Sequence, residues 1–301
     1  MSNGMTRPEC VGGAAPPAAL PSVRWLDGRA AAAVVKQRVA DAVAHWKGPV
    51  APGLAVVLVG SDPPSAAYVR GKVKACRQVG FHSVQVDLPA TASTADVLAS
   101  VGALNRDPAV HGILVQLPLP PQVDAARVIQ AIDSAKDVDG LHPDNLGRLI
   151  SGRPGLVPCT PAGVITLLDH YAIPIAGRRA VVLGRSVLVG LPLSLLLMQR
   201  DATVTVLHRQ SPDPREHTRQ ADLVVSAVGR PGILGADWIK PGAVVVDVGI
   251  TRTPAGLVGD ADPSVASVAS ALTPVPGGVG PMTVATLLAN TLRAAETHVG
   301  A

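Results

Sequence analysis

Apolar positions along the chain fall into short continuous runs separated by longer amphipathic segments. Runs of about four to eight apolar residues bounded by Gly, Pro or polar residues are typical of buried strands, whereas apolar residues at every third or fourth position are typical of helices. The first half of the chain alternates the two patterns. It predicts a helix over 26–46, a strand at 54–60, a helix over 63–79, a strand at 83–89, a helix over 93–104, a strand at 112–118 and a helix over 123–132.

A second alternating set follows a segment at 136–162 that is predicted to consist mainly of loops. Its predicted strands lie at 179–184, 203–207, 222–228 and 243–249, and a last helix is predicted to begin after Pro281 and to run to 297. Strands that alternate with helices and are apolar almost throughout predict an α/β protein with parallel sheets.

Composition and charge indicate what the core is made of and which kinds of binding partner to expect. Apolar residues make up 48% of the 301 residues, but only three Trp, two Tyr and one Phe are present, so the core must be built mainly from aliphatic side chains. The formal net charge of +4 includes no basic tail or stripe. We therefore expect neither nucleic acid nor a membrane surface as a partner, while an anionic substrate remains compatible with the charge.

The cysteines and the most apolar window both favour an intracellular protein without a membrane span. Cys10, Cys76 and Cys159 are an odd number without metal-like spacing, so we expect free thiols in a reducing compartment and no metal site. The window 180–198 is interrupted by Arg185, by glycines and by a proline, and it is therefore interpreted as a strand, a loop and a helix.

The N-terminal segment 1–22 is rich in Gly, Ala and Pro, has no apolar periodicity, and is predicted to be a disordered extension. Glu9 and the prolines at 16–17 stand where a secretory leader would need a continuous apolar run. A cytoplasmic location is therefore expected.

The helix predicted to begin after Asp62, a favourable N-cap, carries the first candidate site. Ser65, Tyr68 and Lys72, at positions i, i+3 and i+7, share one helical face. This helix directly follows a predicted strand, and open α/β sheets bind ligands at the C-terminal ends of their strands. A solvated polar face is the alternative that the spacing alone leaves open.

The stretch VVLGRSVLVGLP (181–192) predicts a strand, a tight turn and a helix whose first N–H groups suit a phosphate. Gly184 would form the turn and Gly190 would allow the helix to pack closely. Short-chain dehydrogenases also use a Tyr and a Lys four residues apart, but their glycine-rich loop precedes that pair. Here the loop lies far downstream, so that family is excluded. The second Gly of the usual fingerprint is replaced by Ser186, so an ordinary strand-to-helix turn stays an alternative.

The next strand ends in TVLHRQS (205–211), which contains no acidic residue to bind the ribose hydroxyls of NAD. Arg209 at this position suits the additional phosphate of NADP. A surface arginine without a ligand is the alternative.

Three further stretches are HGILVQLPLP (111–120), KDVDGLHPDNLGRL (136–149) and TPVPGGVGPMTVATLLANT (273–291). Together with YVRGK and GRSVLVGLP, in this order and spacing, they give a chain that resembles the bifunctional methylenetetrahydrofolate dehydrogenase/cyclohydrolase family over 23–297. The large synthetase domain of the trifunctional relatives is absent from the sequence, so no ligase activity is expected.

The resemblance implies a catalytic α/β domain over 23–160, completed by the C-terminal helix 281–297, and an inserted Rossmann-type domain over 161–280, with a cleft between the two. It implies oxidation of 5,10-methylenetetrahydrofolate with NADP, rather than NAD, and hydrolysis of the methenyl product to 10-formyltetrahydrofolate in one-carbon metabolism. It also implies a homodimer and no metal.

The resemblance assigns roles residue by residue. Lys72 falls on the catalytic lysine, Gln116 on its glutamine partner, Asp139 on the residue that anchors the pterin, and Tyr68 on the tyrosine that stacks on the folate. Further folate-binding positions are Ser65, Leu117, Pro276, Gly277 and Gly278. The cofactor-binding positions are Gly184, Arg185, Ser186, Gly190, Arg209, Gly229 and Ile250.

The chemistry of the two reactions agrees with these roles. Hydride transfer needs the folate and nicotinamide rings to be held face to face, which is a task of positioning. Hydrolysis needs proton transfer, which Lys72 can perform if burial lowers its pKa, while Gln116 holds the amine without adding charge. A dehydrogenase that has lost the hydrolytic step and a non-catalytic folate- or nucleotide-binding scaffold remain alternatives.

Overall fold

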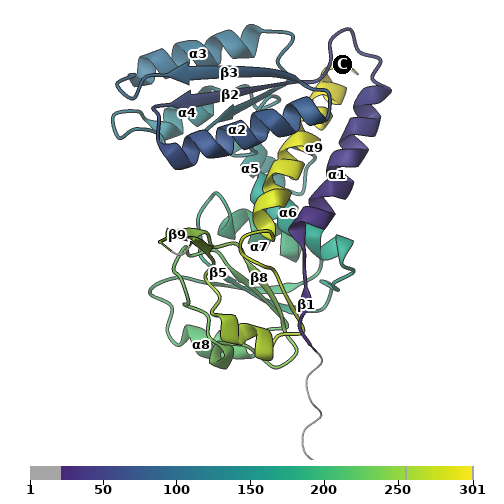
Figure 1. Ribbon diagram of the computed structural model, residues 1–301, viewed down its shortest axis with the longest axis vertical. Coiled ribbons are helices and arrows are strands. Elements are labelled where there is room, and N and C mark those ends of the chain that lie inside the picture. The colour runs from purple at the N-terminus through teal and green to yellow at the C-terminus, as the bar shows by residue number, and fades with distance from the viewer. Residues whose placement is uncertain (1–21, 255, 300–301) are drawn as a thin grey trace, which may run out of the picture.

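The computed structural model describes residues 22–254 and 256–299 as two α/β lobes joined by two long helices (Figure 1). Except for Ser22, the predicted N-terminal extension lies outside the described residues, and so does Cys10. Within the described residues, no helix is both long enough and apolar enough to cross a membrane.

The first lobe contains a three-stranded parallel sheet in the order β3-β2-β4. Every residue of the central strand is buried, because helices cover both faces of a parallel sheet and leave no solvent-facing side. The strands are β2 (Gly53–Val59), β3 (His82–Leu88) and β4 (Gly112–Val115). The helices are α1 (Gly28–Ala44), α2 (Pro63–Gln78), α3 (Thr94–Arg106) and α4 (Ala125–Ala131).

Side-chain caps explain where the helices of this lobe begin. The Asp27 carboxylate accepts a hydrogen bond from the Arg29 N–H at 2.8 Å and caps α1. The Asp62 carboxylate accepts from the Ser65 N–H at 3.0 Å and caps α2, as the sequence predicts. Each cap satisfies a backbone donor that the helix itself leaves free.

The second lobe contains a six-stranded sheet in the order β1-β11-β8-β7-β5-β6, and every neighbouring pair is parallel. Its strands are β1 (Arg24–Trp25), β5 (Arg179–Leu183), β6 (Thr203–Leu207), β7 (Leu223–Ser226), β8 (Val244–Asp247) and β11 (Ala271–Leu272). Its helices are α6 (Cys159–His170), α7 (Gly190–Met198), α8 (Pro214–Arg219) and the 3₁₀ turns η1 (Ala236–Trp238) and η2 (Pro263–Ser267). A small hairpin joins β9 (Thr251–Thr253) to β10 (Gly256–Val258).

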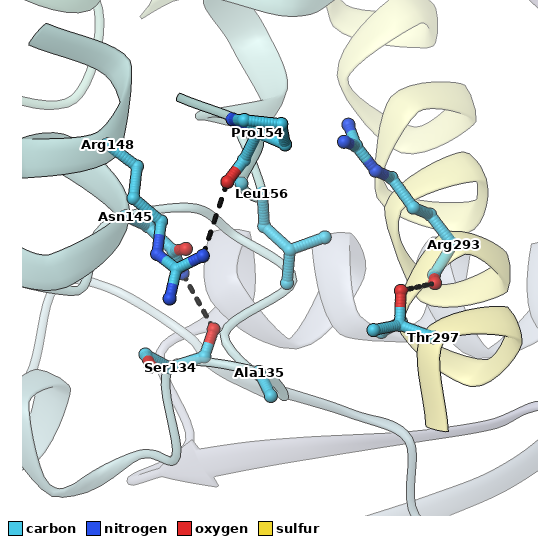
Figure 2. Close-up of a pocket in the computed structure, with 10 residues that line it drawn as sticks. Ser134, Ala135, Asn145, Arg148, Pro154, Leu156, Arg293 and Thr297 are labelled. Atoms are coloured by element: carbon cyan, nitrogen blue, oxygen red, sulfur yellow. Dashed lines mark hydrogen bonds between the residues drawn. The ribbon is translucent and has the colours of Figure 1, made fainter. Parts of the chain in front are cut away.

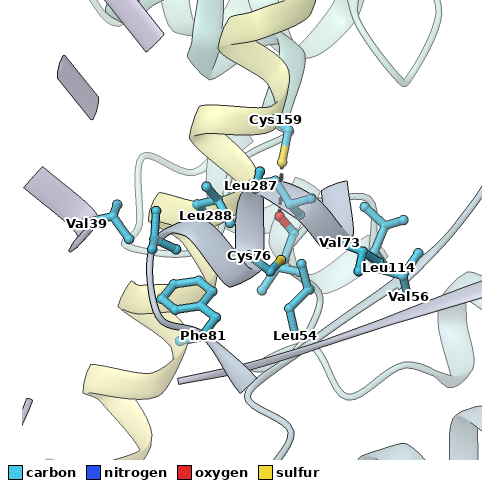
Figure 3. Packing of buried hydrophobic residues seen from close by; sticks show 14 of the residues in the cluster. Val39, Leu54, Val56, Val73, Cys76, Phe81, Leu114, Cys159, Leu287 and Leu288 are labelled. Carbon is cyan, nitrogen blue, oxygen red and sulfur yellow. Dashed lines mark hydrogen bonds between the residues drawn. The ribbon is translucent and has the colours of Figure 1, made fainter. Parts of the chain in front are cut away.

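The C-terminal helix α9 (Val279–Val299) runs from the second lobe into the first, beside α1 (Figure 1). It begins two residues before Pro281, because that proline occupies the first turn, where no N–H is needed. Leu287 and Leu288 of α9 pack in the core of the first lobe against Cys76 of α2 and Phe81 (Figure 3). The helix therefore completes the first lobe.

The structure corrects two sequence predictions. The segment predicted as loops, 136–162, contains all of α5 (Pro143–Ile150) and the start of α6. Prolines are typical of helix breaks, but Pro143 and Pro161 each lie in a first helical turn. In addition, Arg24–Trp25 pairs with β11 in the second lobe, although the predicted boundary assigned these residues to the first domain. A two-residue strand is too short to leave a periodic pattern.

Candidate functional site

The polar face of α2 lies at the C-terminal end of β2, as predicted, and its three residues share one cavity. The Lys72 side chain is buried, with 9% of the residue exposed, whereas Tyr68 is 47% exposed. Ser65 is buried, and its hydroxyl donates to the Asp62 carboxylate at 2.9 Å. The lysine is therefore held inside the cavity and the tyrosine ring stands at its opening.

Lys72 meets Gln116, which directly follows β4. The Lys72 Nζ donates to Gln116 Oε1 at 3.0 Å. The other end of the Gln116 amide, Nε2, donates to the Leu117 carbonyl at 2.7 Å. Because the amide nitrogen is already bonded, the oxygen must face the lysine. The paired strands β2 and β4, which precede α2 and Gln116, thus bring together two residues that are far apart in sequence.

Burial determines the protonation of the groups around this amine. It lowers the pKa of Lys72 below its ordinary value of 10.5, and nearby Asp139 acts in the opposite direction. Burial raises the pKa of Asp139, and the neighbouring Lys72 opposes that shift. Burial also raises the pKa of the Cys76 thiol to about 12 and that of Cys159 well above its ordinary value. Both thiols are therefore protonated near neutral pH, and the Lys72 amine gives up its proton more readily than an exposed lysine does.

The cavity has a volume of about 480 Å³ and is lined by residues of both lobes. It also contains the Thr160 and Thr283 hydroxyls, which hydrogen-bond to each other at 2.9 Å and which sequence reasoning did not select. Thr283 is the last residue of the stretch PGGVGPMT, in which the sequence predicted site residues only in the Pro-Gly turn. The lining residues are Asp62, Ser65, Tyr68, Lys72, Gln116, Leu117, Pro118, Thr160, Leu188, Val189, Val248, Ile250, Val279, Gly280, Thr283 and Val284.

Four predicted folate-binding residues lie beside the cavity and are not among its lining residues. Asp139 is partly buried close enough to Lys72 to interact with its charge. Pro276, Gly277 and Gly278 form the turn that precedes α9, in which the Gly278 N–H donates to the Pro274 carbonyl at 2.8 Å. Gly277 has a φ of +115°, which favours glycine. Their roles in binding folate stay predictions.

A second cavity of about 530 Å³ lies at the C-terminal ends of β5, β6 and β7. The chain crosses from β5 to β6 on one side and continues to β7 on the other, which is where doubly wound sheets bind dinucleotides. Four predicted cofactor residues are in its wall. The lining residues are Leu183, Gly184, Arg185, Ser186, Leu207, His208, Arg209, Ser211, Pro214, Ala227, Val228, Arg230, Ile233 and Trp238.

The other three predicted cofactor residues lie elsewhere. Ile250 lines the cavity that contains Lys72, and it comes from the second lobe. Gly229 lies between two lining residues, Val228 and Arg230, and has a φ of +67°. Arg230 itself was missed by sequence reasoning, since no motif marks it.

Gly190, the third of them, explains why the turn after β5 needs a second glycine. A Cβ at Gly190 would overlap the backbone carbonyl of Gly184, so the start of α7 can approach the turn only without a side chain. Gly184 has a φ of +109°, and a Cβ there would lie 2.6 Å from the Ala227 carbonyl oxygen. The two glycines thus have the roles predicted for them: turn and close packing.

We expect Gly190→Ala to lower the free energy of unfolding by about 1–3 kcal/mol, as overpacking of a filled site does. The displaced turn should also raise the Michaelis constant for the dinucleotide. Denaturant unfolding and dehydrogenase kinetics measure the two effects. Gly147→Ala in α5 is the matched control, because its Cβ would meet no atom within 4 Å. Equal stability of both variants would contradict the packing role.

A third cavity of about 300 Å³ lies along the second half of α9. Figure 2 shows Arg148 of α5 and Arg293 of α9 on either side of Leu156. The Arg148 guanidinium donates to the Pro154 carbonyl at 3.3 Å. None of the predicted site residues lines this cavity, and we assign it no role. Within the described residues, no group of three or more His, Cys, Asp or Glu side chains is arranged to hold a metal ion.

Models of two protein domains match the chain. Residues 26–139 match the catalytic domain of tetrahydrofolate dehydrogenase/cyclohydrolase, and residues 158–299 match the NAD(P)-binding domain of the same family. The chain is also 53% identical over 282 residues to the bifunctional protein FolD of Methylibium petroleiphilum, which covers 93% of this chain and 100% of that protein.

Two solved structures are similar throughout. The bifunctional dehydrogenase/cyclohydrolase FolD of Campylobacter jejuni is 44% identical with a TM-score of 0.90, covering 92% of this chain and 99% of its own. The Trypanosoma brucei dehydrogenase-cyclohydrolase, solved with NADP and an inhibitor, is 42% identical with a TM-score of 0.89, covering 94% of this chain and 100% of its own.

Proposed function

Because the chain belongs to the tetrahydrofolate dehydrogenase/cyclohydrolase family, and is a bifunctional methylenetetrahydrofolate dehydrogenase and methenyltetrahydrofolate cyclohydrolase, we propose that both reactions occur in the cavity around Lys72. The observation that carries this proposal is the hydrogen bond of Lys72 with Gln116 inside a cavity that both lobes line. With both activities present, the dehydrogenase-only and non-catalytic alternatives are set aside. The chain is an oxidoreductase and a hydrolase of one-carbon folate metabolism.

The dehydrogenase step moves a hydride from the bridging methylene carbon of the folate to the nicotinamide ring. It leaves a methenyl cation and a reduced dinucleotide, and no side chain has to accept a proton. The exposed ring of Tyr68 offers the folate a flat contact, while Val248 and Ile250 contribute an apolar wall from the dinucleotide-binding lobe. The Tyr68 ring on one side and Val248 and Ile250 on the other support a stacked arrangement of the folate and nicotinamide rings between them.

The cyclohydrolase step adds water to the methenyl carbon. The neutral Lys72 amine takes a proton from the attacking water as its oxygen bonds to that carbon. The added oxygen then loses its second proton to solvent and becomes the formyl oxygen as the bond from this carbon to N5 breaks. The protonated Lys72 amine passes its proton to N5, which gives 10-formyltetrahydrofolate. The lowered pKa of Lys72 supports a neutral amine, and the positive charge of the methenyl substrate favours it further.

The remaining folate contacts are proposed from the resemblance and the geometry. The Asp139 carboxylate, beside Lys72, would accept hydrogen bonds from the amino group and ring N–H of the pterin. The turn of Pro276, Gly277 and Gly278 would close the site next to α9.

The second lobe is an NAD(P)-binding domain, and within it we favour NADP. Arg209 lines the cavity at the end of β6, and no acidic side chain of the described residues does. Arg185, in the turn after β5, is placed to provide a second cation. The relative from Trypanosoma brucei was solved with NADP.

A homodimer is proposed from the resemblance. Support comes from two exposed apolar side chains at the ends of adjacent helices, Ile150 of α5 (68% exposed) and Met198 of α7 (48% exposed). We expect a dimer mass in sedimentation equilibrium and a shift toward the monomer in Ile150→Glu, since a buried unpaired charge opposes association. A wild-type monomer would contradict the proposal.

Inhibition kinetics test the shared cavity. Purified protein converts 5,10-methylenetetrahydrofolate with a fixed concentration of NADP while the methenyl compound is added as inhibitor. One cavity predicts competitive inhibition, with an inhibition constant equal to the Michaelis constant of the methenyl compound in the hydrolytic reaction measured under the same conditions. Non-competitive inhibition would show two separate sites.

A further inference from the structure

Asp260, which follows β10, is fully buried in the second lobe and its carboxylate accepts four hydrogen bonds. Oδ2 accepts from the Ser226 hydroxyl at 2.7 Å, from the Val228 N–H at 2.9 Å and from the Gly229 N–H at 3.3 Å. Oδ1 accepts from the Arg230 N–H at 2.7 Å. Among the described residues, no basic side chain forms an ion pair with it. Three consecutive N–H groups of the loop after β7, Val228–Arg230, thus donate hydrogen bonds to a single side chain.

Asp247, the last residue of β8, holds the backbone of Asp260 by a hydrogen bond. Its buried carboxylate accepts from the Gly249 N–H at 2.9 Å, the Asp260 N–H at 3.0 Å and the Ala261 N–H at 2.8 Å. The backbone N–H of Asp247 donates to the Thr273 hydroxyl at 2.7 Å. The two aspartates therefore form one connected unit between the ends of β7 and β8.

Two glycines make this unit possible. A Cβ at Gly249 would overlap the carboxylate of Asp260, and a Cβ at Gly259 would overlap the carboxylate of Asp247. Each carboxylate thus reaches its donors only because the segment that approaches it carries no side chain. A buried carboxylate without an ion pair is unfavourable unless donors satisfy it, so seven accepted hydrogen bonds indicate a specialised arrangement.

The segments that this unit holds belong to the walls of both cavities. Val228 and Arg230, on either side of Gly229, line the dinucleotide cavity. Val248 and Ile250, on either side of Gly249, line the cavity that contains Lys72. A rigid connection between these walls would fix where the nicotinamide ring lies relative to the folate.

We propose that Asp260 is a positioning residue for hydride transfer, which holds the Val228–Arg230 loop and, through Asp247, sets it against the folate cavity. This inference rests on the proposed placement of the dinucleotide. Hydrolysis of the methenyl compound needs no hydride transfer, and Lys72 and Gln116 both belong to the first lobe, where they bond to each other rather than to Asp260. A loss of positioning should therefore lower only the dehydrogenase activity, whereas a general loss of stability should lower both activities.

Asp260→Asn tests the proposal, because the amide replaces one acceptor by a donor that faces a backbone N–H. We expect kcat/KM of the dehydrogenase for the dinucleotide to fall about tenfold, the effect of losing a hydrogen bond to a charged group. The fall should be the same for NADP and NAD, since the 2′-phosphate that distinguishes them is proposed to bind Arg209 and not this loop. Hydrolysis of the methenyl compound, assayed without dinucleotide, should be unchanged.

Asp222→Asn is the matched control. Asp222 precedes β7 at the opposite end from Ser226 and accepts from the Arg179 N–H at 3.0 Å and from Lys240 Nζ at 2.6 Å. It lies away from both cavities, so both activities should stay at the wild-type level.

Equal losses of the two activities in Asp260→Asn would overturn the proposal, and so would an unchanged dehydrogenase. If this variant does not fold, Ser226→Ala decides the question, because it removes one donor to Asp260 and leaves the carboxylate in place. A higher Michaelis constant for the dinucleotide with unchanged hydrolysis supports the positioning role. An unchanged Michaelis constant overturns it, whereas loss of hydrolysis in the wild-type protein would concern the proposed function instead.

Discussion

Lys72→Met is expected to lower the cyclohydrolase activity by at least about a hundredfold, the lower range for the loss of a general acid–base group. Methionine keeps the length and the apolar stem of the side chain but has no titratable amine. The dehydrogenase activity should fall less, because hydride transfer requires no proton acceptor. Enzymatic decay of the methenyl compound, corrected for its decay in buffer, measures the effect.

Lys74→Met is the matched control, because Lys74 is on the same helix, is exposed and lies outside the cavity. The pH profile adds a second check. Burial lowers the pKa of Lys72, so the fraction of neutral amine, and with it the hydrolytic rate, should fall as the pH decreases through a value below 10.5. That limb should be absent in Lys72→Met. Wild-type hydrolysis by the variant would show that another group transfers the proton.

Arg209→Ala is expected to raise the Michaelis constant for NADP about ten- to a hundredfold, which corresponds to about 1.5–3 kcal/mol for a hydrogen bond to a charged group. The constant for NAD should stay nearly the same, because NAD has no 2′-phosphate for the arginine to bind. Arg209 is exposed and lines the dinucleotide cavity, so its removal should leave the melting temperature unchanged.

Arg219→Ala, an exposed arginine of α8 outside that cavity, is the control for the general loss of a positive charge. It should change neither constant. Equal increases with NADP and NAD in Arg209→Ala would mean that the arginine supports the loop after β6, and the preference for NADP would then need another cause.

The sequence alone was sufficient for the fold class and for most of the long elements. β2 and β5 are visible as apolar runs because helices cover both faces of a parallel sheet. Asp62 marks the start of α2 because a helix leaves its first N–H groups free for a side chain. Such signals are local, since each depends on residues within a few positions along the chain.

Part of the candidate site was also accessible from the sequence. Lys72 and Tyr68 share a helical face by their spacing alone, and the rule that parallel sheets bind ligands at the C-terminal ends of their strands placed them near a site. The resemblance to a known family supplied Gln116, and the structure joins it to Lys72 by a hydrogen bond.

Only the tertiary structure decided which segments meet. α6 and α9 bring Thr160 and Thr283 together, although 123 positions separate them in the chain. Asp260 looks like one more polar residue in a loop, yet folding buries it below the ends of two strands, where it accepts four hydrogen bonds. Periodicity and capping describe neighbours along the chain, whereas the walls of a cavity and the partners of a buried carboxylate depend on packing between distant segments.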